Sequence, residues 1–169
     1  MRRIVTGLGD DGRSTTIADG APPTHAVVPV ADIQGYLLWM TQHTPANNSG
    51  TDDAAACPFP AKTAPPCGTC FYFFEYPSLK DASPEQVDAL LKGGQASDTH
   101  DHPGMHVSDT TDYLIMLSGE LTAIVEEGEA TLRPGDMMVN RGGYRAFENR
   151  GPMPARFAVV SIGATAAGR

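Results

Sequence analysis

Clusters of Lys and Arg are absent from this 169-residue chain, whose formal net charge is −8. Nucleic acids and anionic membrane surfaces are bound mainly by clustered basic side chains, so we expect neither as a partner. The chain also lacks an apolar run near the ~18 residues that a membrane-spanning helix needs. The apolar stretch of a secretory signal does not follow Met1-Arg2-Arg3 either. The expected location is therefore the cytoplasm.

Cysteine is scarce, and its spacing does not identify a redox or metal centre. Cys57, Cys67 and Cys70 are an odd number, and the last two form a C-x-x-C. A redox-active C-x-x-C usually opens a helix, whereas Cys70 runs directly into FYFFEY, which has the composition of a strand. A zinc site needs four ligands, and no second C-x-x-C or H-x₃-H is present. Free thiols are the simplest interpretation, with a redox pair or half a zinc site as alternatives.

Glycine and proline are plentiful instead. The chain contains 18 Gly and 14 Pro, a composition that favours turns and short strands over long helices. Its length predicts a single domain, residues 1–169. Residues 1–42 predict a β-hairpin arm and two further strands, at 2–6, 13–17, 26–30 and 35–40. Residues 43–68 form a long loop rich in Pro and Ala, of the kind that is typically a lid or an oligomer contact.

The next segment, residues 69–105, predicts an aromatic strand at 71–76, a helix and a loop. A capping box of Ser83 and Gln86 predicts the helix start, and the helix should end after Lys92.

Residues 106–163 carry strand after strand at short, even spacing, with glycine-bearing turns between them. The expected strands are 112–117, 121–126, 130–132, 137–140, 144–149 and 155–162. This rhythm predicts a small antiparallel sandwich or barrel. Met137 and Met138 lie in one of these strands, where core filling is the usual role of Met.

Two spaced motifs lie in this region. The first is H-x-S-x₃-D-x₆-G, made by His106, Ser108, Asp112 and Gly119. The second runs from the turn Pro134-Gly135-Asp136 through Gly142 to Arg145-x₃-Asn149. They resemble the two motifs of the cupins, H-x-H-x₃-E-x₆-G and a Pro-Gly-Asp turn followed by H-x₃-N. The segments RRIVTG and PGMHVSDTTDY are similar to those of small bacterial single-domain cupins.

The resemblance implies an all-β fold: a cupin-like double-stranded β-helix (jelly-roll barrel) with an N-terminal β-hairpin arm and one short helix. It also implies a homodimer, because cupins of this kind commonly pair through such arms, and a structural role for Asn149.

Strand alternation places the motif side chains on one face. The first three positions of the first motif should face the barrel interior, and the arginine of the second motif should join them from a facing strand. Apolar residues on the same faces should form the wall around them. Tyr113 and Tyr144 alternate to the opposite face, where they should pack or form an interface. The candidate catalytic residues are His106, Asp112 and Arg145, and the candidate substrate-binding residues are Ser108, Leu114, Met116 and Phe147.

The motifs keep too few metal ligands. A typical cupin offers three imidazoles and one carboxylate, whereas only His106 and Asp112 stand at those positions here. Ser108 is a poor ligand, and Arg145 is a permanent cation where the metal would lie. We therefore expect no metal or other cofactor, with Arg145 in the metal's electrostatic role. The alternative is a rebuilt divalent-metal site of His102, His106 and Asp112.

Three functions fit these residues. The first is a metal-independent isomerase or lyase for a small anionic or carbonyl-bearing metabolite, in which Arg145 binds a carboxylate or enolate while His106 and Asp112 move a proton. The second is a non-catalytic cupin that binds or senses a metabolite. The third is a metal-dependent oxygenase or lyase that uses His102, His106 and Asp112. All three remain open at the level of sequence.

Overall fold

The computed structural model describes residues 1–28, 32–60, 64–80, 82–87, 102 and 104–166. These residues form eleven strands that pair antiparallel in three sheets. The strands are β1 Arg3–Leu8, β2 Ser14–Gly20, β3 Thr24–Val28, β4 Ile33–Thr41, β5 Thr69–Tyr76, β6 Thr110–Ser118, β7 Leu121–Val125, β8 Gly128–Leu132, β9 Met137–Arg141, β10 Arg145–Glu148 and β11 Ala155–Gly163.

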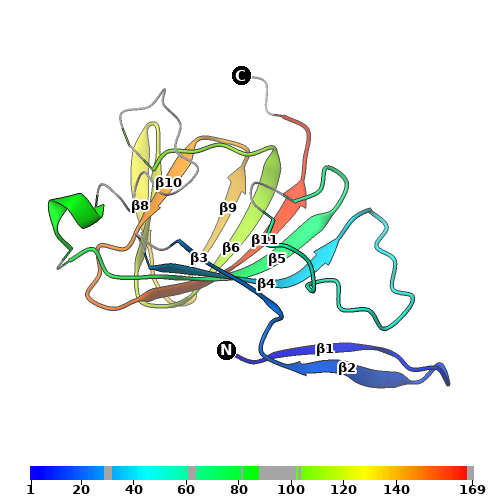
Figure 1. Cartoon of the computed structure of the whole chain (residues 1–169). Coiled ribbons are helices and arrows are strands. Elements are labelled where there is room, and N and C mark those ends of the chain that lie inside the picture. Colours follow the sequence, from blue (N-terminus) through cyan, green and yellow to red (C-terminus); the bar gives the residue numbers. More distant parts are fainter. Residues whose placement is uncertain (29–31, 61–63, 81, 88–101, 103, 167–169) are drawn as a thin grey trace.

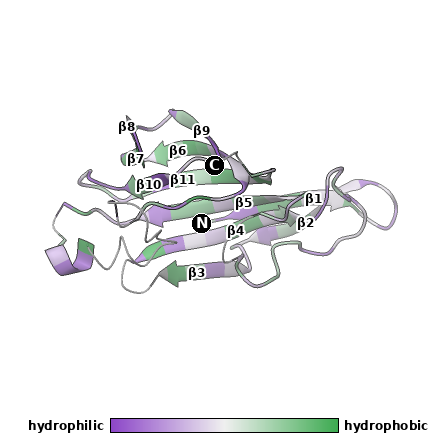
Figure 2. Cartoon of the chain, turned by 90° about the horizontal axis from the view of Figure 1, so that it is seen from above, coloured by the Kyte–Doolittle hydropathy of each residue, from purple (hydrophilic) through white to green (hydrophobic). Residues whose placement is uncertain are grey.

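Two of the sheets make the barrel. The larger has the strand order β3-β4-β5-β11-β6-β9 and the smaller has the order β10-β7-β8, while β1 and β2 pair with each other as an arm. The arm lies apart from the two barrel sheets (Figure 1). In the view from above, β3, β4, β5 and β11 follow one another across the larger sheet (Figure 2). The expected all-β, cupin-like double-stranded β-helix with an N-terminal arm is confirmed.

One helical turn is described, at residues 84–87. The Ser83 backbone N–H donates to Oε1 of Gln86 (2.8 Å), and the Gln86 N–H donates to Oγ of Ser83 (3.2 Å). This is the predicted capping box, so the start of the helix is confirmed. Its predicted end after Lys92 lies outside the described residues. No helix among the residues that the structure describes is long and apolar enough to cross a membrane.

An apolar core lies between the two barrel sheets. At its centre is Phe157 on β11, which is 2% exposed. Its ring centroid lies 5.6 Å from that of Phe74, 5.2 Å from that of Tyr76 and 6.3 Å from that of Phe147. Both sheets contribute to the buried cluster, which contains Leu114, Met116, Leu121, Leu132, Ala155 and Phe157. Removing this surface from water is the main force that holds the sheets face to face.

The long loop of residues 43–68 contributes to a second buried cluster, which contains Leu37, Ala55, Ala64, Cys70 and Tyr72. The Thr24 hydroxyl lies 2.6 Å from the carbonyl oxygen of Ala55 and 2.8 Å from that of Cys57, and ties the loop to β3. The described part of the loop around Ala55 and Ala64 is therefore packed against the larger sheet, whereas residues 43–52 are exposed. The three cysteines are free thiols.

Strand β9 corrects one expectation. Met138 packs against the core, but Met137 is 74% exposed, so the prediction that both fill the core was wrong for Met137. Consecutive residues of a strand point to opposite faces, so only one of two adjacent methionines can point inward. Tyr113 on β6 is 44% exposed and lies on the outer face, as expected.

Two motif residues support the chain around the start of β11. Asn149, 1% exposed, donates through Nδ2 to the carbonyl oxygens of Tyr76 (3.0 Å) and Met153 (2.8 Å). Its Oδ1 accepts from the Gly151 N–H (3.0 Å). Gly119 has a φ of 75°, and a Cβ there would stand 2.4 Å from the carbonyl oxygen of Pro154. The structural role expected for Asn149 is confirmed, and Gly119 permits the close approach of two backbone segments.

The arm is attached to the barrel by Arg3. Its guanidinium donates to the carbonyl oxygen of Leu38 on β4 (2.8 Å) and pairs with both carboxylate oxygens of Asp53 in the long loop. The outer face of β1 carries two large apolar side chains in water: Ile4 is 55% and Leu8 is 56% exposed.

Replacing the central core ring tests this packing. Phe157→Ala should lower the free energy of unfolding by about 3–5 kcal/mol, because it removes a fully buried aromatic group and leaves a cavity. Phe71→Ala, on the outer face of β5 and 38% exposed, is the matched control and should cost less than about 1 kcal/mol. Urea denaturation of both variants measures the difference, and equal losses would contradict the assignment of the core.

Candidate functional site

A row of polar side chains crosses the inner face of the larger sheet. Asp112 on β6 pairs in register with Ser161 on β11 and with Asn140 on β9. Residues directly opposite each other in an antiparallel pair point to the same face, so these three form one row, which we call the polar row. All three side chains are buried. The adjacent row, two residues along each strand, is apolar and contains Val159, Leu114 and Met138.

Arg145 reaches this row from the smaller sheet. Its Nη2 donates to the Asp112 carboxylate (Oδ2, 2.8 Å) and to the Ser108 hydroxyl (2.8 Å). The other carboxylate oxygen of Asp112 accepts from the Ser161 hydroxyl (2.7 Å), and Ser108 shares a hydrogen bond with Thr110 (2.7 Å). The structure thus brings together two of the predicted catalytic residues and one predicted binding residue.

The guanidinium of Arg145 is only partly satisfied. The residue is 6% exposed, yet Nε and Nη1 have no hydrogen-bond partner among the described residues. Burial lowers the pKa of Arg145 below its ordinary value, and the neighbouring Asp112 opposes that shift. A guanidinium nevertheless keeps its proton in proteins, so the barrel interior contains a permanent positive charge with unused donors.

His106 lies directly beside Arg145. The two residues exchange backbone hydrogen bonds (2.9 and 3.0 Å), which places their side chains on the same face. The His106 Nδ1 lies 3.0 Å from the carbonyl oxygen of Gly104. Because a carbonyl only accepts, Nδ1 carries the proton and Nε2 has the lone pair. Burial, and then the charge of Arg145, lower the pKa of His106 below its ordinary 6.5. At neutral pH it is therefore a neutral imidazole able to accept a proton.

The other predicted binding residues lie in the wall. Leu114 and Met116 are buried in the core cluster, and Phe147 packs against it from the smaller sheet. The Phe147 ring centroid lies 6.4 Å from that of His106. Phe147 is thus the apolar residue of this set that contacts a candidate catalytic group.

Sequence reasoning missed two tyrosines on β5. Tyr72 and Tyr76 lie on the inner face of that strand, where the alternation within FYFFEY would have placed them. Burial raises the pKa of Tyr76 to about 12, although the nearby charge of Arg145 pulls it down. Burial, followed by a hydrogen bond with Cys70, also raises the pKa of Tyr72. Both phenols therefore stay protonated at neutral pH and can donate hydrogen bonds.

The residues present do not fit a divalent metal. Among the described residues, no three His, Cys, Asp or Glu side chains are grouped so as to hold an ion. His102 belongs to a different network: its Nδ1 accepts from the Gly104 N–H (3.2 Å), and its Nε2 bonds to Glu148 (3.0 Å). At the metal position of the motifs the described side chains are one imidazole, His106, and one carboxylate, Asp112. Asp112 already pairs with Arg145. Metal sites in proteins usually have three or four ligands.

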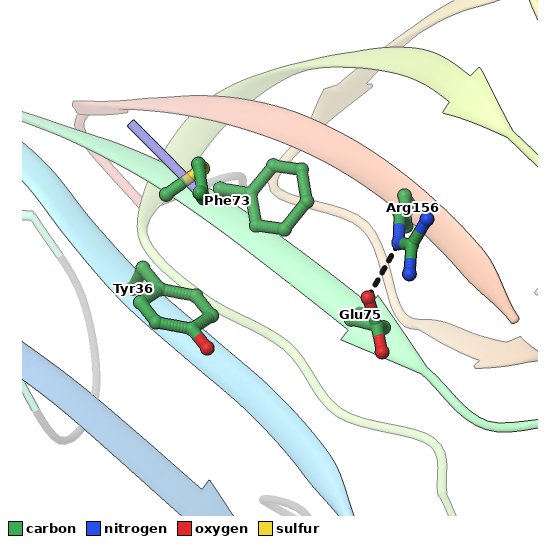
Figure 3. A pocket seen from close by; sticks show the side chains of 5 residues that line it. Tyr36, Phe73, Glu75 and Arg156 are labelled. Atoms are coloured by element: carbon green, nitrogen blue, oxygen red, sulfur yellow. Dashed lines mark hydrogen bonds and ion pairs between the residues drawn. The ribbon is translucent and has the colours of Figure 1, made fainter. Parts of the chain in front are cut away.

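A separate hollow lies on the outer face of the larger sheet, beside the arm. It has a volume of about 320 Å³ and is lined by Met1, Tyr36, Phe73, Glu75 and Arg156 (Figure 3). Glu75 and Arg156 neutralise each other in an ion pair of 2.5 Å. Next to the polar row on the inner face, Arg145 offers unpaired buried donors and His106 offers a base. This region is therefore the stronger candidate site.

Known proteins resemble this chain in structure, at low sequence identity. No family model matches the chain, and no curated protein matches it. A solved structure from Salmonella typhimurium, described as an ethanolamine utilization protein Q, is similar with a TM-score of 0.49 and 12% identity, covering 98% of each chain. An RmlC-like cupin family protein with a double-stranded β-helix fold from Methanocaldococcus jannaschii has a TM-score of 0.39 and 17% identity, covering 56% of this chain and 69% of that one. A cupin superfamily protein from Desulfitobacterium hafniense has a TM-score of 0.38 and 10% identity, covering 56% of this chain and 66% of that one. All three TM-scores are below 0.5 and all three identities below 25%, so no activity, ligand or cofactor of these proteins is assigned to this chain.

The lowered pKa of His106 is directly testable. An NMR titration of its ring should give a pKa below the ordinary 6.5, and Arg145→Gln should raise that pKa because one cause of the shift is removed. Between the folded-state pKa and 6.5 the unfolded chain binds more protons, so the free energy of unfolding should fall as the pH is lowered through this window. His106→Gln should lack this contribution. A folded-state pKa above 6.5 would contradict the assignment.

Proposed function

We propose that the barrel interior binds a small carboxylate- or enolate-bearing metabolite on Arg145, and that the protein is an isomerase or lyase that needs no metal. The observation that carries this proposal is the buried guanidinium with unused donors on Nε and Nη1. A buried N–H without a partner costs about 1–3 kcal/mol, and more on a charged group. An anionic oxygen at these atoms would recover that energy through charge-assisted hydrogen bonds.

His106 supplies the base in this proposal. Its Nε2 lone pair takes a proton from the carbon next to the substrate carbonyl, and the electron pair moves onto the carbonyl oxygen. The positive charge of Arg145 nearby stabilises the resulting enolate, as a preorganised charge does where negative charge develops. Return of the proton to a different carbon gives isomerisation, whereas expulsion of a leaving group from the neighbouring carbon gives a lyase reaction.

In this proposal Asp112 positions Arg145 and does not transfer a proton. Both of its oxygens already accept hydrogen bonds, one from Arg145 and one from Ser161. We therefore assign it the task of holding Arg145 in place, and assign the proton to His106 alone. Tyr76, with its raised pKa, remains a neutral donor in the same interior.

A second candidate is a binding or sensing protein without turnover. The mutual bonding of Arg145, Asp112, Ser108 and Thr110 favours it, because these groups are held in place by each other. The two candidates share the ligand contact with Arg145 and differ in whether His106 moves a proton.

Ligand binding separates these possibilities. A small carboxylate found by thermal-shift screening should bind at least about 10-fold more weakly to Arg145→Gln, because a charge-assisted contact is lost. Arg145→Lys, which keeps the charge, should retain more of the affinity, and Arg133→Gln, on the surface, should bind like the parent. For the enzyme, His106→Gln should keep binding but lower turnover by about 10²–10⁴-fold.

Calorimetry, assays of ligand conversion and metal analysis complete that experiment. A chelator should change neither binding nor turnover. Near-stoichiometric metal that disappears in His106→Ala would refute the metal-independent proposal. A ligand that binds and stays chemically unchanged over long incubation would support the binding protein instead.

We also propose that the arm joins two copies of the chain in a homodimer. A two-stranded hairpin is only marginally stable by itself, and the exposed Ile4 and Leu8 offer an apolar face on β1.

The double substitution Ile4→Asp and Leu8→Asp should shift the protein towards monomers while the barrel stays folded. Light scattering after size exclusion measures this, with Thr15→Asp on β2 as a control. A parent protein that is monomeric at all concentrations would refute the dimer.

A further inference from the structure

Asn140 is a buried polar residue that neither motif contains. It is 8% exposed, and its Nδ2 has no hydrogen-bond partner among the described residues. The flanking residues of β9 show that its inward position is set by alternation, since Met137 and Val139 are 74% and 58% exposed. A buried N–H₂ group without a partner destabilises the fold, and an aliphatic side chain at this inward position would not.

Two observations place this amide beside Arg145. Asn140 is the register partner of Asp112, the residue whose carboxylate lies 2.8 Å from Nη2 of Arg145. Side chains of such a pair have Cβ atoms about 4.5–5.5 Å apart. In addition, Oδ1 of Asn140 lies 3.9 Å from the place where a Cβ of Gly143 would be, in the turn that leads into Arg145. The oxygen end of the amide thus lies near this turn, and its N–H₂ end is unused.

We infer that Asn140 is a specificity residue of the proposed site, where it donates to a neutral carbonyl oxygen of a small oxo acid whose carboxylate binds Arg145. This inference rests on the proposed function and adds the substrate class to it. It follows from the chemistry of the unused atoms: Nε and Nη1 of Arg145 and Nδ2 of Asn140 are all N–H donors, so the ligand must be rich in acceptors.

The two donors differ in charge, and this difference defines the ligand further. A guanidinium prefers an anionic oxygen, whereas a neutral amide serves a carbonyl oxygen. The acceptor on the protein side is Nε2 of His106, on the same face as Arg145. A molecule with a carboxylate next to a ketone, and a proton on the carbon beyond that ketone, matches all three groups.

Paired ligands test this assignment. The first set is 2-oxo acids of increasing chain length, and the second is the carboxylates that lack only the keto oxygen. The parent protein should bind an oxo acid more tightly than its matched carboxylate. Asn140→Leu, of similar volume, should weaken the oxo acid about 10-fold and leave the carboxylate unchanged, so that the preference disappears. Arg145→Gln should weaken both ligands together.

The stability of the unliganded variant distinguishes recognition from a structural role. Asn140→Leu should be at least as stable as the parent in urea, because an amide without a partner is removed. A loss of stability, an oxo-acid preference that survives in Asn140→Leu, or an equal loss for both ligands would overturn the inference while leaving Arg145 as the carboxylate site. If no acid of either set binds the parent, the proposed function fails, and this inference fails with it.

Discussion

The buried ion pair between Arg145 and Asp112 is the contact on which the rest of the interior depends. It joins β10 of the smaller sheet to β6 of the larger one, at 2.8 Å, inside the barrel. Removing two charges from water is expensive, and only good geometry with further hydrogen bonds offsets that cost. Ser108 and Ser161 provide those bonds, one on each side of the pair. A change at either charged residue alone would leave an uncompensated charge in the core.

The pair also controls the electrostatics of its surroundings. His106 is joined to Arg145 by two backbone hydrogen bonds, so the backbones that carry the imidazole and the guanidinium are held side by side. The positive charge disfavours a second positive charge on the imidazole, and burial acts in the same direction. In the proposed function one residue therefore provides the anion-binding charge and keeps its neighbour in the form that accepts protons. On the opposite wall it moderates the pKa of Tyr76, which burial raises.

The fold was predictable from the sequence because its turns require particular residue types at fixed spacings. Gly119 has a φ of 75°, which glycine adopts readily, and Asn149 bonds to Met153 at the turn before β11 as well as to Tyr76 on β5, so both positions belong to a spaced motif. Ser161 and Asn140 are different, since the register between strands brings them beside Asp112 from distant parts of the chain. No local sequence pattern indicates the register between these strands. The error at Met137 has a related cause, because composition identified the strand and left open which of two adjacent residues points inward.

The arginine in the barrel has one more consequence. A bound metal ion must be acquired from the surroundings, can be exchanged for a competing ion, and can be removed by a chelator. The guanidinium of Arg145 is part of the polypeptide and is present as soon as the barrel closes. Its charge at the centre of the barrel is therefore independent of the supply of metals around the protein. The same permanence means that the protein has no apo form at this position: the guanidinium, paired with Asp112, is present in every folded molecule.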